Sequence, residues 1–217
     1  LNSIMQQTKV RFTRASYEIL GLSFLGLFLE LAIIRWLSSE IRIFAYFKNL
    51  PLLAAFLGFG TGFWLSDKWE RFFPWFPRLI CYLVIIMAGA AGFGLTHVIF
   101  VDPKQYFLLG VGFGDHASLS IPSFLQITKA LTVIVAFFFL MAVFASLASK
   151  LGQLLNQDRP LRGYSLNVAG SLFGIIGFSL VSFLHSPPAV WFLIFFSGML
   201  YFFRERLKST LVYFVAA

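Results

Sequence analysis

The sequence predicts an all-α fold: a polytopic transmembrane helical bundle of six to seven spans that forms a single transmembrane domain over residues 1–217. Composition is the first observation behind this prediction. Of the 217 residues, 59% are hydrophobic and 12% are charged, which is about half the charged fraction of a typical soluble domain. The mean hydropathy is +0.84. So little polar surface cannot cover a water-soluble globule, whereas a bilayer removes the need for a polar exterior.

Apolar runs of about 20 residues, the length that crosses a bilayer, are the second observation. Six segments qualify, namely 18–37, 50–66, 79–101, 123–148, 164–184 and 188–203. The sequence His185-Ser-Pro-Pro188 separates the last two, because paired prolines end one helix and can start the next. A seventh span starting near residue 210 stays open. The chain stops at Ala217 within this fresh apolar run, so we expect it to be part of a longer polypeptide.

The distribution of the 17 Lys and Arg residues is the third observation. With a cytoplasmic N-terminus, the cations on that side are Lys9, Arg11, Arg14, Lys68, Arg71, Arg78, Lys150, Arg159, Arg162, Arg204, Arg206 and Lys208. The opposite side and the outer helix ends hold Arg35, Arg42, Lys48, Lys104 and Lys129. This bias predicts that the N-terminus is cytoplasmic. The positive-inside bias therefore accounts for the net charge of +8, and we expect no nucleic-acid partner.

Glu30 is the candidate binding residue, an acid about 10 Å from the outer end of the first span. A carboxylate at that depth needs a partner, because an isolated charge in the bilayer is costly. Lys129 in the fourth span has a similar predicted depth, and Arg35 at the mouth is the second candidate partner. One interpretation is a binding site that opens outward. The other is a structural ion pair that fixes helix packing.

Small residues in the second and fifth spans predict close helix packing, since they let two backbones approach. They are Gly58, Gly60 and Gly62, and Asn167, Gly170 and Gly174. The first group lies inside a span with no preceding strand, which argues against a phosphate-binding loop. Asn167 would form an interhelical hydrogen bond.

We predict no catalytic residue and no metal site in this chain. The histidines His97, His116 and His185 match no tight ligand spacing, and no Ser–His–acid or Cys–His arrangement has any specificity. No cofactor is therefore expected, although bound lipid is. A pigment stays open as an alternative ligand, because His97 lies inside a predicted span and imidazole can ligate one.

Two stretches resemble a known family. They are Phe28-Leu-Glu30-Leu-Ala-Ile-Ile-Arg35 with the glycine-rich segment that follows, and Tyr164-Ser-Leu-Asn167-Val-Ala-Gly170-Ser-Leu-Phe-Gly174. Together they resemble the N-terminal membrane region of bacterial spermidine-synthase-like integral membrane proteins. In that family the first span carries Glu and Arg, the second is glycine-rich, and a later span reads Tyr, acid or amide, then Gly-x-x-x-Gly. Asn167 stands where many relatives have Asp, which removes a charge.

The resemblance implies an anchor for a catalytic domain similar to aminopropyltransferases and adenosyl-dependent methyltransferases, which would lie beyond residue 217. Whether the natural protein is an enzyme therefore stays open. For this chain we expect a non-catalytic scaffold in the bacterial inner membrane, with lipids and other membrane subunits as partners. Two alternatives remain: an accessory subunit of a respiratory or photosynthetic complex, and a transporter of polyamine-like small molecules with an outward-facing Glu30 site.

Overall fold

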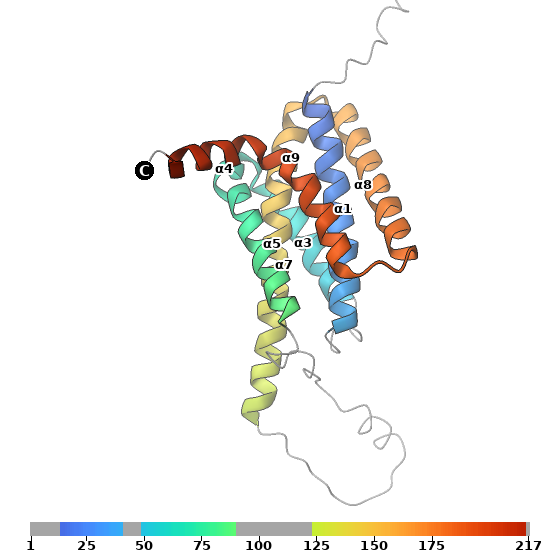
Figure 1. The fold of residues 1–217 in the computed structure, drawn as a ribbon, viewed down its shortest axis with the longest axis vertical. Coiled ribbons are helices and arrows are strands. Elements are labelled where there is room, and N and C mark those ends of the chain that lie inside the picture. The colour runs from blue at the N-terminus through green and yellow to red at the C-terminus, as the bar shows by residue number, and fades with distance from the viewer. Residues whose placement is uncertain (1–13, 41–48, 90–122, 216–217) are drawn as a thin grey trace, which may run out of the picture. The chain divides into compact units, whose positions relative to one another are not determined.

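The computed structural model describes residues 14–40, 49–89 and 123–215, with the side chains of 123–130 and 202–215 excepted. Within these ranges the chain is helical and contains no strand (Figure 1). The elements are α1 (Arg14–Glu40), α3 (Asn49–Trp64), η2 (Ser66–Lys68), α4 (Trp69–Phe72), η3 (Phe73–Trp75), α5 (Phe76–Ala88), α7 (Ser123–Gln157), α8 (Pro160–Phe183) and α9 (Pro188–Val215). The predicted all-α class is thereby confirmed.

Four segments of the described chain are long and apolar enough to cross a membrane: Arg14–Glu40, Ser66–Ala88, Leu131–Gln157 and Pro160–Phe183. Two shorter apolar helices, Asn49–Trp64 and Pro188–Tyr201, occupy the second and sixth predicted spans. The protein is therefore an α-helical membrane protein by length and composition. Its span count and sidedness stay predictions, because the second half of the third predicted span lies outside the described residues.

The chain divides into two compact units, which are described here one at a time. The first unit comprises residues 1–32 and 150–217, and the second comprises residues 33–149. Both boundaries fall inside continuous helices, α1 and α7.

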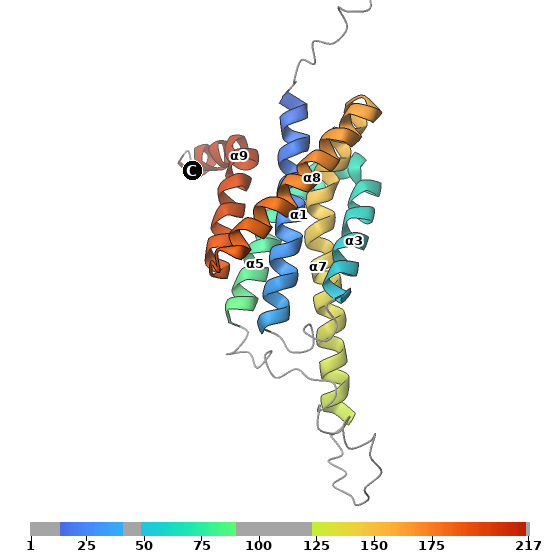
Figure 2. The same ribbon diagram turned by 90° about the vertical axis from the view of Figure 1, so that its right-hand side faces the viewer.

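In the first unit, α1 and α8 lie side by side and run in the same direction (Figure 2). Two contacts show the common direction. Near the start of both helices Arg162 donates a hydrogen bond to Ser16, and further along both the Phe28 and Phe178 rings meet edge to face with centroids 5.5 Å apart. Phe178 also contacts Trp191 of α9 at 5.3 Å. Edge-to-face aromatic pairs of this kind stabilise packing beyond simple burial, so they help to hold α1, α8 and α9 together.

The turn between α8 and α9 follows the predicted proline signal. α8 ends at Phe183, His185 takes a positive φ of 54°, and Pro188 is the first residue of α9. Ser186 connects the two helices, because its hydroxyl donates to Val181 O at 2.7 Å and accepts from Trp191 Nε1 at 2.8 Å.

The second unit contains α3, α5 and most of α7, joined at one end by the short elements η2, α4 and η3. Prolines explain that irregular connection. Pro74 lies in η3 and Pro77 in the first turn of α5, and proline lacks the backbone donor that a longer helix would need at these positions. α3 and α7 run parallel, since Gly58 lies against Met141 and Gly62 against Ala145.

These two parallel pairings agree with the predicted order of spans. α1 and α8 correspond to the first and fifth predicted spans, and α3 and α7 to the second and fourth. Consecutive spans cross in opposite directions, so the first and fifth spans should run in the same direction, and so should the second and fourth. The structure shows this for both pairs.

The C-terminal helix extends beyond the sixth predicted span. We predicted that this span ends at residue 203 and is followed by a charged cytoplasmic segment, and a seventh span near residue 210 stayed open. In the structure α9 continues through this segment to Val215. The segment 199–215 contains neither Gly nor Pro, and Arg, Glu and Lys are good helix formers, so nothing in the local sequence interrupts the helix.

Candidate functional site

Glu30 lies in α1 and is buried, with 9% of its surface exposed. Within the described part of the chain its carboxylate has no hydrogen bond and no ion pair. Helix geometry places it seven residues, and so nearly two full turns, beyond Ser23, on the face that contacts α8. An ionisable group so placed in an apolar span is a functional-site hypothesis by default.

The structure bears on one of the two predicted partners of Glu30 and leaves the other as a prediction. Arg35 is exposed and follows Glu30 by five residues of the same helix, so it projects about 140° around the axis from the carboxylate. The two side chains therefore occupy different faces of α1. Lys129 lies in the first turns of α7, where side chains fall outside the described residues. Its pairing with Glu30 stays a prediction.

Asn167 lies beside α1 at a polar contact. Ser23 Oγ is 2.7 Å from Asn167 Oδ1 and 2.7 Å from Ile19 O on its own helix. A hydroxyl has one proton and cannot donate to both oxygens. An amide turned by 180° resolves this, because its NH₂ group then donates to Ser23 while Ser23 donates to Ile19. The predicted interhelical hydrogen bond of Asn167 is thus present.

Gly170 and Gly174 lie on the same face of α8, against the main chain of α1. A Cβ atom built on Gly170 would collide with the carbonyl oxygen of Leu20, and one on Gly174 with that of Phe24. Real Cβ atoms do not approach carbonyl oxygens so closely, so only glycine permits this separation of the two helices.

Gly58 and Gly62 create a second close approach, between α3 and α7. A Cβ on Gly58 would lie 2.6 Å from Met141 O, and one on Gly62 would lie 2.5 Å from both Ala145 O and Ala148 Cβ. Gly60 is different, because it is exposed and a Cβ there would meet nothing within 4 Å. The packing role expected of Gly60 is therefore wrong, and helix geometry explains why: two residues turn the helix by about 200°, to the opposite face.

Two polar contacts of the first unit were missed in the sequence. Ser23 was not singled out, although a serine within an apolar span often bonds to a neighbouring helix. Arg162, expected only as a cytoplasmic charge, reaches Ser16 on α1 and lies 3.9 Å from Asp158.

Metal ligands do not cluster in the described ranges, where no group of three or more His, Cys, Asp or Glu side chains could hold an ion. His97 and His116 lie outside those ranges, and His185 occupies the α8–α9 turn. Comparison with protein-family models, curated proteins and solved structures finds no match to this chain, so the resemblance seen in the sequence remains an expectation.

Proposed function

We propose that this chain is a non-catalytic membrane scaffold, an anchor module that packs within a larger membrane assembly. The two-faced character of α8 is the observation that carries the proposal. One face is fastened to α1 through Gly170, Gly174 and Asn167. The other exposes a continuous set of large apolar side chains: Leu161, Tyr164, Val168, Leu172, Phe173, Ile175, Ile176, Leu180 and Phe183.

An apolar surface that follows a whole span must be covered by lipid tails or by another helix. Because α8 is held against α1 by rigid backbone contacts, this surface is presented in a fixed shape. A fixed shape favours a partner that packs against it, since association inside a bilayer depends on van der Waals fit and not on the hydrophobic effect. The exposed α8 face therefore suits a neighbouring subunit.

Site-specific photo-cross-linking tests this role. A photoreactive residue at Leu172, on the exposed face of α8, should yield one adduct of defined protein mass in native membranes. The same residue at Tyr82, on the exposed surface of α5, is the comparison. Adducts with lipid alone at both positions would overturn the scaffold proposal. The intact mass of the natural polypeptide then distinguishes the anchor of a longer protein from a separate accessory subunit of 24.5 kDa.

Glu30 supports a second candidate function, the binding of a polyamine-like cation during transport. The supporting observation is the buried carboxylate without a partner in the described residues. Glu30→Gln should abolish spermidine uptake into proteoliposomes while leaving the yield of folded protein intact. Glu40→Gln, an exposed acid at the end of the same helix, is the matched control. Equal uptake by both variants, or none by the wild type, would exclude this candidate.

A further inference from the structure

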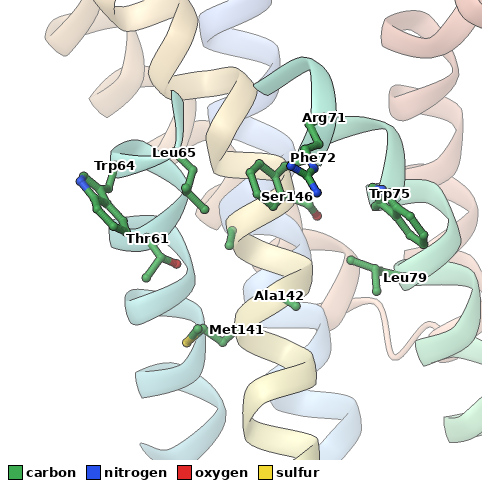
Figure 3. Close-up of a pocket in the computed structure, with 11 residues that line it drawn as sticks. Thr61, Trp64, Leu65, Arg71, Phe72, Trp75, Leu79, Met141, Ala142 and Ser146 are labelled. Atoms are coloured by element: carbon green, nitrogen blue, oxygen red, sulfur yellow. The ribbon is translucent and has the colours of Figure 1, made fainter. Parts of the chain in front are cut away.

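A groove of about 560 Å³ lies within the second unit, between α3 and α5, with α7 as its floor (Figure 3). Its volume is within the range of about 300–1,000 Å³ that is typical of ligand pockets. The lining residues come from α3 and the turn after it, from α4, η3 and α5, and from one stretch of α7: Thr61, Trp64, Leu65, Arg71, Phe72, Trp75, Leu79, Met141, Ala142, Ala145 and Ser146.

The groove exists because α7 carries small side chains at this point. Ala142, Ala145 and Ser146 present small side chains between the larger residues of the two flanking helices. Trp64 on one wall and Trp75 on the other are 82% and 53% exposed. Figure 3 shows these two indole rings on opposite sides of α7. The groove is therefore lined by apolar residues and has a tryptophan on each wall, and tryptophan is enriched at the membrane–water interface.

The two hydroxyl groups of the lining do not make it polar. Thr61 Oγ1 donates to Leu57 O at 2.9 Å, and Ser146 Oγ donates to Val143 O at 2.7 Å, each within its own helix. Both donors are satisfied by carbonyl groups of the backbone. The walls therefore present an apolar surface that suits a hydrocarbon chain, and neither hydroxyl is free to donate to a polar solute.

Arg71 is the charged residue among those that line the groove. Figure 3 shows the Arg71 side chain at the end of the groove that lies next to α4. The side chain is exposed, and within the described residues it has no hydrogen bond or ion pair with protein. Lys68 precedes it in η2, and Arg78 lies over the Trp75 ring at 5.2 Å. The acids of this segment are Asp67 and Glu70, which leaves the segment with a net positive charge.

We propose that this groove binds an anionic phospholipid, with one acyl chain along the floor formed by α7 and the phosphate held by Arg71. The apolar groove suits the acyl chain of such a lipid, and the Arg71 guanidinium at its end suits the phosphate, since guanidinium groups bind phosphate through paired donors. The predicted topology places Arg71 at the cytoplasmic surface, where anionic lipids attract basic residues. The groove shares no residue with α8 or with the Glu30 site, and the proposal does not depend on the scaffold proposal.

Native mass spectrometry of the intact chain in detergent tests the proposal. The protein is titrated with phosphatidylglycerol and with phosphatidylcholine of identical acyl chains. Arg71→Gln should weaken phosphatidylglycerol binding about fivefold, the loss expected for one basic contact near the surface. It should weaken phosphatidylcholine binding less, because the choline group of that lipid already neutralises its phosphate. Arg159→Gln, an exposed cation after α7, is the control for charge.

Filling the groove tests the acyl-chain half of the proposal. Ala142→Phe should weaken binding of both lipids, whereas Ala136→Phe, on the same helix but outside the groove, should not. If Ala142→Phe does not fold, Leu79→Trp fills the groove from α5. Wild-type lipid binding in both the Arg71 and the groove-filling variants overturns the proposal. An effect of Arg71→Gln alone overturns it too, because the lipid would then lie elsewhere. Loss of a co-purifying protein without a change in lipid binding would assign the groove to a partner helix.

Discussion

The α3–α7 and α1–α8 contacts both bring parallel helices close together through glycines spaced four residues apart, but the two contacts use different partners. In the α3–α7 contact, Gly62 faces two alanines, Ala145 and Ala148, whereas Gly58 lies against Met141 O and Phe144 Cβ. In the α1–α8 contact, Gly170 and Gly174 also lie against carbonyl oxygens, those of Leu20 and Phe24, but the Cβ atoms beside them belong to the larger residues Ser23 and Leu27.

The two contacts also differ in polarity. Ser23 and Asn167 exchange a hydrogen bond between α1 and α8, whereas Thr61 and Ser146 each bond within their own helix. Among the described residues, packing therefore fixes the α3–α7 pair, including the Phe59 and Phe144 rings at 5.5 Å, while packing and polar contacts together fix the α1–α8 pair. A small-residue motif in a membrane sequence predicts a close approach, but it does not predict which of these two designs holds the helices in register.

Gly62→Val should have the largest effect, because two fixed groups of α7 lie 2.5 Å from the position of the new Cβ. Neither a carbonyl oxygen nor an alanine Cβ can rotate away, so α3 must move as a whole. We expect the free energy of unfolding to fall by about 3 kcal/mol, the upper part of the overpacking range. Unfolding in mixed micelles of mild detergent and dodecyl sulfate measures the change.

Gly60→Val is the matched control for that substitution. It makes the same chemical change two residues earlier in the same helix, where the new side chain meets nothing within 4 Å. We expect a change within about 0.5 kcal/mol, as for substitutions that disturb no contact. Equal destabilisation by both variants would mean that glycine acts through helix flexibility and not through the contact with α7.

Gly174→Val should cost less, about 2 kcal/mol within the same range. The new Cβ would collide with one fixed group, the Phe24 carbonyl oxygen, while the next neighbours lie 3.2 and 3.3 Å away. α8 exposes most of its surface, so it can also shift away from α1. Ser165→Val on the exposed side of α8 is the control, and both are compared by thermal unfolding in detergent. A greater loss for Gly174→Val than for Gly62→Val would contradict the comparison.

The sequence predicted the helical class and the packing faces because both depend on local spacing. Gly58 and Gly62 share a face by their four-residue separation. Our prediction wrongly included Gly60, although the same argument excludes it, because it lies two residues from each. The partner helix of each face could not be predicted, since any span can in principle lie against a glycine stripe. Ser23 was overlooked for the same reason: its partner is 144 residues away in the chain.

The candidate site was harder to predict than the fold. Glu30 is identifiable because an acid within an apolar span is unusual, but its partners depend on how distant helices rotate. Arg35 is close in sequence and yet lies on another face of α1. The groove beside Arg71 has no sequence signature at all, because small residues of α7 create it only when they lie between α3 and α5.

A pair of double-mutant cycles should detect the smallest difference between the two helix pairs. Combining Ser23→Ala with Asn167→Ala should give a coupling free energy of about 0.6 kcal/mol, the average for interhelical hydrogen bonds in a membrane. The matched cycle of Thr61→Ala and Ser146→Ala, on α3 and α7, should give a coupling near zero, because each hydroxyl bonds to its own backbone. Equal coupling in the two cycles would show that the Ser23–Asn167 contact contributes nothing specific. In that case the glycine contacts, together with the hydrogen bond from Arg162 to Ser16, would fix the register of α1 and α8.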